Sequence, residues 1–392
     1  MVQRKVTVVG AGPAGLMAAD AAAGAGAAVT LVDQRRSFGR TLLLAGRSGL
    51  NLTHAEPLDD FLSRYGEGRD LVEPAIRAFP PDAVRAWADA LGADTFVGSS
   101  GRVFPAAMRA TGLVRAWTAR LAELGVEMRT GVSWSGFDES LAADAVVLAL
   151  GGASWPSVGG DGSWAEVVRQ AGIAVEPLIA SNAGVVVDWS APMRERHEGQ
   201  PIKNARLSIG GRSVRGEPTV TRSGLEGGPV YALGPEIRAA VAEGDAVLRI
   251  DVQPDRSPEA LAAHLTERRR DRDSVSTWLR RAGVAPVVVD LLRDATGNDI
   301  PTDPSALAAL LQGVPVPVLA VASLDRAISS AGGVAGHEVD ETGMLRSRPG
   351  WWVAGEMLAW DAPTGGYLIQ ACLSTGRAAG RAAAQAGGPV AA

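Results

Sequence analysis

Cysteine is almost absent from this sequence, and lysine is nearly so. The single cysteine, Cys372, excludes an intramolecular disulfide, a CxxC redox pair and a metal site built from several cysteines. Lys5 and Lys203 are the two lysines, so arginine supplies nearly all of the positive charge, a pattern typical of codon bias. The formal net charge is −5, which does not favour a protein that coats nucleic acid.

The sequence also lacks a long apolar run. No stretch of about 20 apolar residues is free of charge or proline, so we expect no membrane span. The chain begins directly with the strand-like run KVTVVGAG, which leaves no room for a signal peptide, and we therefore expect a cytoplasmic protein. Glycine, by contrast, is abundant: 48 of the 392 residues are glycine, which predicts many tight turns or close approaches of the backbone to a ligand.

The first glycine-rich segment lies inside a predicted β-α-β unit. Residues 5–10 have the apolar pattern of a strand, residues 14–26 are Ala-rich and helical, and residues 28–33 form a second strand. The segment between the first strand and the helix reads VTVVGAGPAGLMAAD, which contains the pattern G-x-G-x-x-G. The pattern alone is a weak signal, but a strand before it and a helix after it are the context in which it binds a dinucleotide.

Each glycine of this pattern has a separate role. Gly10 permits the tight turn, Gly12 lets the backbone approach a pyrophosphate, and Gly15 lets the helix pack closely on the strand. The helix N-terminus then offers unpaired N–H groups to the phosphates. Asp33 ends the second strand 18 residues after Gly15, close to the usual spacing for a carboxylate that binds a ribose hydroxyl, and it argues against a 2′-phosphate. This segment therefore predicts NAD or FAD.

A second glycine-rich segment, WWVAGEMLAWDAPTGGY, favours FAD. It combines a strand, the pair Gly355-Glu356, and a helix entrance at residues 363–366. FAD is long and needs a second anchor: Glu356 can accept a hydrogen bond from a ribityl hydroxyl or bind near the pyrophosphate. Gly365 and Gly366 can bring N–H groups against the pyrimidine edge of the flavin. A helix N-terminus there would stabilise negative charge on the reduced ring.

The remaining sequence predicts an α/β domain with an insertion. Short β-like runs punctuated by Gly and Pro fill residues 183–255, helical patterns follow, and β-like residues return at 315–322. We expect an FAD-binding domain from residues 1–177 and 331–392, an inserted antiparallel β-barrel from residues 178–256 and 313–330, and a helical subdomain from residues 257–312. No second G-x-G-x-x-G pattern occurs between residues 160 and 340, so NADH or NADPH, as co-substrate, would bind transiently in the substrate cleft.

Several further motifs occur in one order along the chain. They are GRTLLLAGRSGLNLTH (39–54), GRVFP (101–105), GGASWPSVGGDGSW (151–164), TRSGLEGGPV (221–230), SSAGGV (329–334), AGE (354–356) and PTGGY (363–367). Together they resemble the BaiN/YhiN-like bacterial flavoproteins, which are NAD(P)/FAD-dependent oxidoreductases. The resemblance implies a Rossmann-type, glutathione-reductase-like FAD-binding domain with an inserted antiparallel β-barrel and a small helical subdomain.

The first of these motifs also departs from the family pattern. Thr41 stands where the family has lysine, and Gly49 where it has arginine. Leu50 replaces the family's cysteine, so any thiol role is absent here, and His54 replaces an asparagine. These departures indicate a divergent subfamily, whose substrate cannot be carried over from better-known members.

The resemblance and the motif chemistry together predict the residues that contact FAD. They are Gly10, Ala11, Gly12, Pro13, Ala14 and Gly15 for the pyrophosphate; Asp33 for the adenosine ribose; Arg40 and Thr41 for the phosphates or ribityl chain; Asn51 beside the isoalloxazine; Val132, on a strand, for adenine through its backbone amide; Gly151 and Gly152 for the adenosine side; and Gly355, Glu356, Thr364, Gly365, Gly366 and Tyr367 for the ribityl and flavin end. Gln34, Arg35 and Gly39, which adjoin these residues, are also predicted to contact the cofactor.

Catalytic residues are not identified by the sequence, because flavin chemistry is mostly the cofactor's own. His54 is either an acid/base group or an ordinary hydrogen-bonding residue, and Asp361 either relays protons or caps a loop. Three functions stay open. The first is an FAD-dependent oxidoreductase acting on a small organic substrate, with NAD(P)H or O2 as partner. The second is a flavoprotein of nucleic-acid modification, and the third is a non-catalytic flavin-binding protein.

Overall fold

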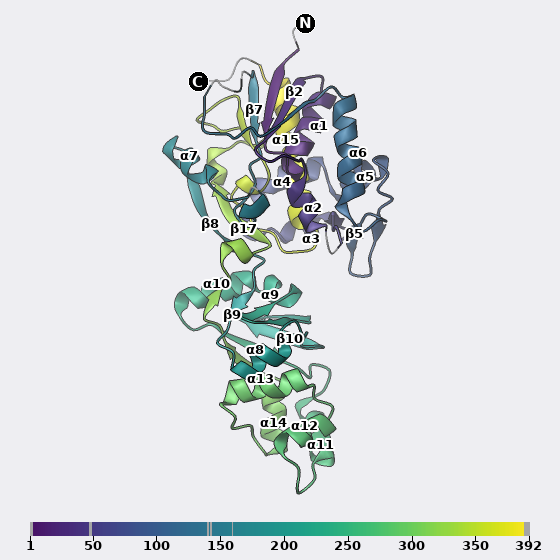
Figure 1. Cartoon of the computed structure of the whole chain (residues 1–392), viewed down its shortest axis with the longest axis vertical. Coiled ribbons are helices and arrows are strands. Elements are labelled where there is room, and N and C mark those ends of the chain that lie inside the picture. The colour runs from purple at the N-terminus through teal and green to yellow at the C-terminus, as the bar shows by residue number, and fades with distance from the viewer. Residues whose placement is uncertain (1–2, 47–48, 139–140, 142, 159, 388–392) are drawn as a thin grey trace. The chain divides into compact units, whose positions relative to one another are not determined.

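The computed structural model describes residues 3–46, 49–138, 141, 143–158 and 160–387, and it divides the chain into two compact units (Figure 1). The first unit comprises Met1–Ser181 and Ile328–Ala392, and the second comprises Asn182–Ala327. The second unit is therefore an insertion in the sequence of the first. Among the described residues, no helix is long and apolar enough to cross a membrane.

A five-stranded parallel sheet forms the centre of the first unit. Its strand order is β18-β7-β1-β2-β6, and its strands are β1 (Lys5–Val9), β2 (Ala28–Asp33), β6 (Glu127–Thr130), β7 (Ala145–Leu148) and β18 (Trp351–Val353). Strand β18 comes from the segment after the insertion and pairs in parallel with β7. Strands β1, β7 and β18 are apolar and almost wholly buried, as expected for a parallel sheet covered on both faces, whereas the edge strand β6 is largely exposed.

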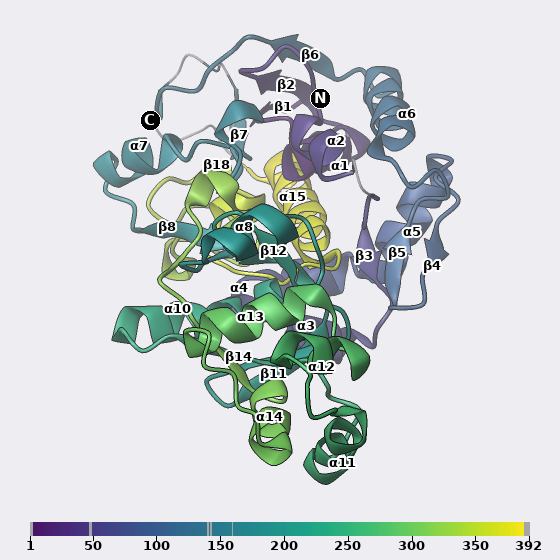
Figure 2. The same ribbon diagram turned by 60° about the horizontal axis from the view of Figure 1, so that its bottom comes forward.

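Helices α1 (Pro13–Gly24) and α15 (Tyr367–Gln385) pack against each other beside this sheet, as Figure 2 shows. Glycine on α15 makes this close approach possible: a Cβ atom at Gly376 would lie 2.2 Å from the carbonyl oxygen of Ala14. A Cβ atom at Gly380 would lie equally close, at 2.2 Å, to the carbonyl oxygen of Ala18. The helix that follows the second glycine-rich segment therefore lies directly on the helix that follows the first.

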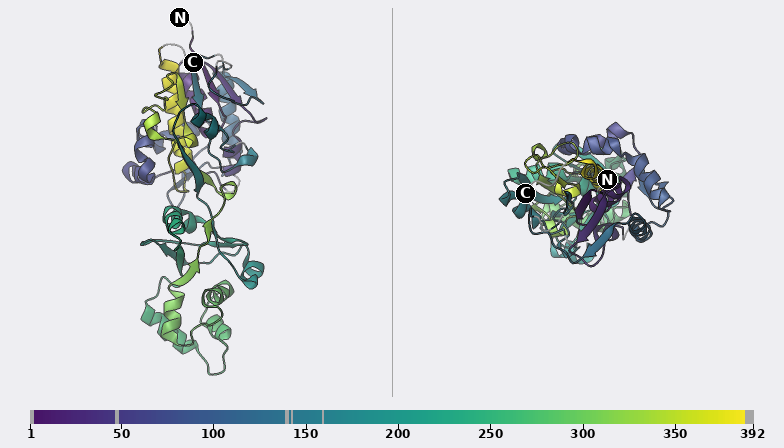
Figure 3. Two further views of the ribbon diagram at one scale, coloured as in Figure 1. Left: turned by 90° about the vertical axis from the view of Figure 1, so that its left-hand side faces the viewer. Right: turned by 90° about the horizontal axis from the view of Figure 1, so that it is seen from above.

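Shorter elements complete the first unit (Figure 3). They are α2 (Arg40–Ala45), β3 (Thr53–His54), α3 (Leu58–Ser63), α4 (Arg69–Ala78), α5 (Pro81–Ala90), β4 (Phe96–Val97), β5 (Arg102–Phe104), α6 (Ala110–Glu123), α7 (Trp164–Gln170), β8 (Val175–Ser181) and β17 (Ser329–Val334). Strands β3, β5 and β4 make a small sheet, and β8 pairs antiparallel with β17.

The second unit contains two separate antiparallel sheets and a group of helices. One sheet has the order β11-β10-β14-β15 and the other β12-β13-β9-β16. Their strands are β9 (Val185–Val186), β10 (Ala205–Ile209), β11 (Arg212–Gly216), β12 (Thr219–Thr221), β13 (Gly224–Glu226), β14 (Val247–Asp251), β15 (Val314–Pro317) and β16 (Ala320–Val321). The helices are α8 (Ala191–His197), α9 (Gly228–Ala232), α10 (Gly234–Glu243), α11 (Pro258–Arg268), α12 (Val275–Arg281), α13 (Pro286–Thr296) and α14 (Pro304–Leu311).

The antiparallel character of the insertion is as predicted, but the closed barrel is not confirmed. The described strands form two open four-stranded sheets instead of one continuous closed sheet. Strand length gives a physical reason. The edge strand β16 has only two residues, which is too short to pair with a strand of the other sheet and join the two sheets into a barrel.

Candidate cofactor site

Two of the three N-terminal glycines are required by packing. Gly10 has a φ of +96°, and a Cβ atom there would lie 2.3 Å from the carbonyl oxygen of Ala149. A Cβ atom at Gly15 would lie 1.7 Å from the carbonyl oxygen of Gly10. Gly12 differs, since a Cβ atom there would meet only the Oγ1 of Thr41, at 3.5 Å. The surface above Gly12 is thus open enough for a ligand to approach the backbone.

The N-terminus of α1 lies at this opening. Gly12 is the N-cap residue and provides no side chain to bond the first amides, while Pro13 occupies the first helical turn. The first helical hydrogen bond runs from the amide of Leu16 to the carbonyl of Gly12, at 2.9 Å. The amides of Ala14 and Gly15 therefore have no acceptor within the helix and can bind an anion.

Asp33 holds the glycine loop to the end of β2. Its Oδ2 accepts a hydrogen bond from the amide of Ala11 at 2.7 Å, and its Oδ1 accepts one from the amide of Arg35 at 2.7 Å. Both oxygens keep a further lone pair. A contact to a ribose hydroxyl stays a prediction, and the structure adds a second role that the sequence did not indicate. Gln34, the residue after Asp33, is exposed.

Helix α2 also begins at the glycine loop. Gly39 has a φ of +68° and donates its amide to the carbonyl of Ala11 at 2.8 Å. Thr41 follows two residues later, and its Oγ1 would lie 3.5 Å from a Cβ atom at Gly12. Arg40, between them, is exposed. The start of α2 and the start of α1 thus converge at Gly12, where the pyrophosphate is predicted.

Three buried polar atoms near these helix ends have no partner in the protein. They are Oγ1 of Thr41, Oδ1 of Asn51 and Oγ1 of Thr53. Buried polar atoms are nearly always hydrogen-bonded, because leaving one unpaired costs roughly 1–3 kcal/mol. Three such atoms in one part of the chain indicate a place where a polar ligand supplies the missing bonds.

The C-terminal glycines bring the second segment against the first. A Cβ atom at Gly355 would lie 2.7 Å from the Cβ of Ala14 on α1. A Cβ atom at Gly366 would lie 2.6 Å from the Cα of Thr53 on β3. Both glycines have positive φ angles, +75° and +98°, which other residues rarely adopt. Gly366 therefore lies against the backbone of Thr53, a residue whose buried hydroxyl has no partner.

Glu356 belongs to a buried network with Ser330 and Gly152. Its Oε1 accepts hydrogen bonds from the amide of Ser330 at 2.8 Å and from the Ser330 hydroxyl at 3.2 Å. A Cβ atom at Gly152 would lie 2.7 Å from the Glu356 carboxyl carbon, so this glycine is required by the close packing. Burial raises the pKa of Glu356 above its ordinary value, against the lowering effect of the Ser330 and Gly152 bonds. A bond to a ribityl hydroxyl stays a prediction.

Val132 does not lie where the sequence placed it. Strand β6 ends at Thr130, because Gly131 has a φ of +77° and turns the chain. Val132 follows in a loop, and its amide donates to the carbonyl of Asp33 at 3.1 Å. An adenine would have to displace that bond or meet the carbonyl oxygen of Val132. Gly151 has a φ of +77° and accepts a hydrogen bond from the indole of Trp164 at 2.9 Å.

A polar cluster surrounds Tyr367, and the sequence indicated only part of it. The Tyr367 hydroxyl donates to Oε1 of Glu56 at 2.5 Å, and Arg64 donates to Oε2 of Glu56 at 2.7 Å. The ring of His54 stacks on that of Tyr367, with centroids 5.5 Å apart. Glu56 and Arg64 were missed because Glu56 and Tyr367 lie 311 residues apart, and no local pattern marks either acidic or basic partner.

The ionisation of this cluster is defined by its contacts. Burial, followed by the hydrogen bond to Glu56, raises the pKa of Tyr367 well above its ordinary value of 10.0. Burial pushes the pKa of Glu56 upward, but the bonds from Arg64 and Tyr367 bring it below its ordinary value of 4.5. Nε2 of His54 lies 2.9 Å from the carbonyl oxygen of Ser100, while its buried Nδ1 has no hydrogen-bond partner.

Asp361 and Cys372 are placed by the structure in supporting positions. Asp361 accepts a hydrogen bond from Ser181 and another from the amide of Ala362 at 2.8 Å, which matches loop capping. Cys372 is buried among small residues of α15, and burial raises the pKa of its thiol. Neither residue is needed to account for the unpaired polar atoms.

Together these residues fit FAD. A ligand that is long, polar and anionic at its centre would run from the end of β2 past the α1 N-terminus to the loop at Gly366, and it would supply the partners that Thr41, Asn51 and Thr53 lack.

Comparison with known proteins gives the same assignment. The model of the HI0933-like protein Rossmann domain matches residues 4–382. The 3-dehydro-bile acid delta(4,6)-reductase of Clostridium scindens is 26% identical over 97% of this chain and 99% of its own.

Solved structures resemble the fold at low identity. A flavocytochrome c3 fumarate reductase matches with a TM-score of 0.49 and 18% identity, over 98% of this chain and 78% of its own. The 3-ketosteroid-delta4-(5alpha)-dehydrogenase of Rhodococcus jostii matches with a TM-score of 0.48 and 17% identity, over 98% and 97%. Likenesses at this level carry no information on the substrate.

The family match covers nearly the whole chain, and the residues of the site fit the cofactor of that family. The chain therefore belongs to the HI0933-like Rossmann-domain family, and its expected identity as a BaiN/YhiN-like flavoprotein and FAD-dependent oxidoreductase is confirmed.

Proposed function

We propose that this protein reduces a carbon–carbon double bond conjugated to a carbonyl group in a small, largely apolar organic substrate. The reductase of Clostridium scindens, similar over nearly the full length of both chains, supports the reaction class. Bound FAD, once reduced, would supply a hydride for the β-carbon of the double bond, and a proton must reach the α-carbon to balance the reaction. NADH or NADPH is the proposed reductant of the flavin.

The observation that carries the FAD-binding part of this proposal is the group of unpaired polar atoms where the two glycine-rich segments meet. Thr41 lies at Gly12 and Thr53 at Gly366, and we take these two residues, with Asn51 two positions before Thr53, to mark one course from the α1 N-terminus to the loop at Gly366. That course ends beside Tyr367, so the groups that hold protons lie at the end of the site where the flavin ring is predicted.

The cluster around Tyr367 provides a way to hold and move a proton. Burial and the hydrogen bond to Glu56 raise the pKa of Tyr367, so the hydroxyl is protonated at neutral pH and donates to the Glu56 carboxylate. His54 stacks on the same ring, and its Nδ1, which has no hydrogen-bond partner, lies 3.9 Å from Oε1 of Glu56. We assign the proton donor to this cluster, with Tyr367 nearest the loop of Gly365 and Gly366.

The test begins with the visible spectrum of the purified protein. We expect a yellow protein, or a colourless one that becomes yellow with added FAD. Anaerobic addition of NADH or NADPH should bleach the flavin absorbance, and adding a conjugated cyclic enone should then restore it in the absence of oxygen. The saturated ketone is the product to identify by mass spectrometry.

Each alternative has its own outcome. A protein that cannot be loaded with FAD would refute the cofactor assignment. A flavin that neither nicotinamide bleaches, but that an amine or alcohol substrate reduces with oxygen as acceptor, would replace the reductase by an oxidase. A flavin that is reduced by nicotinamide but never reoxidised by any enone would refute the substrate class alone.

A further inference from the structure

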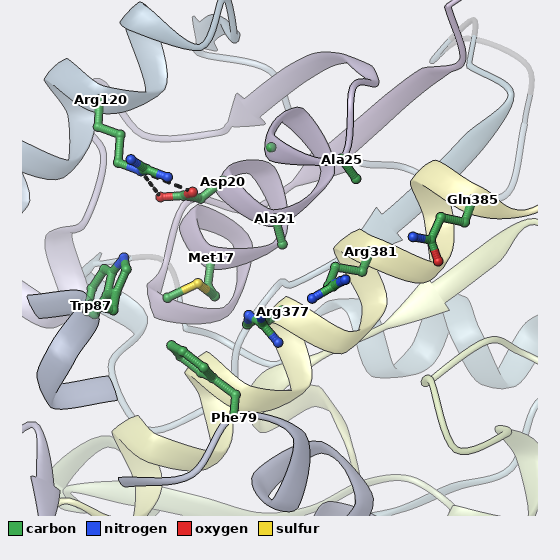
Figure 4. A pocket seen from close by; sticks show the side chains of 11 residues that line it. Met17, Asp20, Ala21, Ala25, Phe79, Trp87, Arg120, Arg377, Arg381 and Gln385 are labelled. Atoms are coloured by element: carbon green, nitrogen blue, oxygen red, sulfur yellow. Dashed lines mark hydrogen bonds and ion pairs between the residues drawn. The ribbon is translucent and has the colours of Figure 1, made fainter. Parts of the chain in front are cut away.

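A cavity lies in the first unit between helices α1, α5, α6 and α15, away from the predicted FAD contacts. It has a volume of about 450 Å3, within the usual range for small-molecule sites. Its lining residues come from α1, α5, α6, α15 and the turn before α5, as Figure 4 shows; they are Met17, Asp20, Ala21, Gly24, Ala25, Phe79, Trp87, Arg120, Arg377, Arg381 and Gln385.

The charge in this cavity is unbalanced. Asp20 is buried, and its carboxylate accepts hydrogen bonds from the Trp117 indole at 3.0 Å and from Nε of Arg120 at 3.0 Å. These bonds pair Asp20 with Arg120, and among the described residues neither arginine of α15 has a carboxylate partner. The lining therefore carries two uncompensated positive charges.

Those charges sit one helical turn apart on α15. Within the described part of the chain, Arg381 has no hydrogen bond or ion pair, and Arg377 has no carboxylate partner. Arg377 lies with its Cζ 4.8 Å from the Phe79 ring centroid and donates weakly to the carbonyl of Ala78 at 3.4 Å. Burial, then the neighbouring Arg381, lowers the pKa of Arg377. Like charges at this spacing repel, and an anion bound between the two arginines would relieve that repulsion.

The rest of the cavity lining is mostly apolar. Phe79 and Trp87 supply aromatic faces, and Met17, Ala21 and Gly24 of α1 add a surface of small or flexible side chains. The combination suits a ligand with a ring at one end and an anionic group at the other.

We infer that this cavity binds an organic anion, a carboxylate or phosphate ester carried on an aromatic or alicyclic ring, with the anionic group held by Arg377 and Arg381. The inference does not depend on the proposed reaction, because no residue of the cavity belongs to the predicted FAD contacts. It gives the protein a ligand site separate from the flavin.

Isothermal titration calorimetry of the FAD-loaded protein tests this. The probes are phenyl phosphate and phenylacetate, with inorganic phosphate and benzyl alcohol as probes that keep only the charge or only the ring. We expect saturable binding of one or both aromatic anions, and binding at least tenfold weaker for the two partial probes. The relative affinity of the two aromatic anions decides between phosphate and carboxylate.

Variants locate the site. Arg381→Gln removes an exposed charge and should weaken binding of the aromatic anion roughly tenfold to a hundredfold, the loss expected for a charge-assisted hydrogen bond. Trp87→Phe replaces the indole by a smaller ring, reduces the aromatic surface of the lining and should weaken binding several-fold. Arg115→Gln, on the exposed surface of α6 outside the lining, is the matched control and should change nothing.

Two results would overturn the inference. One is the absence of saturable binding of either aromatic anion to the wild-type protein. The other is equal affinity in wild type and Arg381→Gln, which would place the bound anion elsewhere, for example at the substrate end of the flavin site. The flavin absorbance of each variant reports that the protein remains folded and loaded.

Discussion

At the scale of single residues, Asp33 has two roles that experiment can separate. Its carboxylate holds the amides of Ala11 and Arg35, and it is predicted to bind the adenosine ribose. We expect Asp33→Ala to lower FAD affinity at least tenfold and to lower the melting temperature of the FAD-free protein as well. Asp33→Asn, which keeps one acceptor oxygen, should lose affinity with a smaller loss of FAD-free stability. Unchanged FAD retention in both variants would contradict the ribose role.

Thr41 gives a prediction in which two measured quantities change in opposite directions. Its buried hydroxyl has no partner in the protein, so replacing it by an isosteric methyl group breaks no internal hydrogen bond. Thr41→Val should therefore leave the FAD-free protein as stable or up to roughly 1 kcal/mol more stable. FAD affinity, measured by fluorescence titration, should fall several-fold. A loss of FAD-free stability without a loss of affinity would show that the hydroxyl serves the protein alone.

Tyr367 tests the proton-donor assignment. Tyr367→Phe keeps the ring that stacks on His54 and removes the hydroxyl bound to Glu56. The oxidation of reduced flavin by substrate should slow roughly 10²-fold or more, the contribution typical of general acid catalysis. Anaerobic stopped-flow measurement should show flavin reduction by the nicotinamide within twofold of wild type. Equal slowing of both half-reactions would indicate a displaced flavin instead.

At the scale of elements, the contact between α1 and α15 depends on two glycines. Gly376→Ala would place a methyl group 2.2 Å from the carbonyl oxygen of Ala14, and the two helices would have to separate. We expect a loss of roughly 1–3 kcal/mol in the free energy of unfolding, and reduced FAD retention because Ala14 lies at the predicted pyrophosphate.

Gly112→Ala is the control for that change. Gly112 is also helical, lies on α6, and has no atom within 4 Å of the position of a new Cβ. This substitution should stabilise the protein by roughly 0.5–1 kcal/mol, because alanine is the better helix former. Denaturant titrations of both variants provide the comparison, and similar behaviour of the two would contradict the packing argument.

The elements also show how far the sequence could predict the molecule. The β-α-β unit follows from local pattern, and α1 begins and ends within two residues of its expected bounds. Glycines could be predicted in both segments because positive φ angles, as at Gly10 and Gly366, and close packing, as at Gly15, exclude most other residues. Glu56 and Arg64 were not found, because nothing nearby in the sequence reveals a partner hundreds of residues away. The barrel was predicted from many short strands, a pattern that two small open sheets share.

At the scale of the whole molecule, the second unit has its own buried ion-pair network. Asp290 on α13 accepts hydrogen bonds from Nε2 of His197 at 2.9 Å and from Arg293 at 2.7 Å. Burial pushes the pKa of Asp290 upward, but these two bonds bring it below its ordinary value of 3.8. The network therefore stabilises the folded second unit above about pH 3.8, and that stability is lost as the pH falls through the lowered pKa.

Calorimetry of the full chain checks this pH dependence. Asp290→Asn should destabilise the second unit by about 2 kcal/mol at pH 7, and the difference from wild type should shrink below pH 3.8. Asp255→Asn, in the exposed pair with Arg215, is the control and should change stability much less than Asp290→Asn does, because solvent screens an exposed ion pair. A difference that grows toward acid pH would contradict the network's role.

The close packing of α15 on α1 has a consequence for the synthesis of this protein. The ribosome makes α1 early, but its packing partner emerges only after residues 25 to 366 have been translated. At about 5–20 residues per second, the nascent N-terminal segment waits tens of seconds without the helix that completes the flavin end. Chains released before residue 367 should therefore fail to retain FAD, and flavin fluorescence of C-terminally truncated translation products would report when the site is complete.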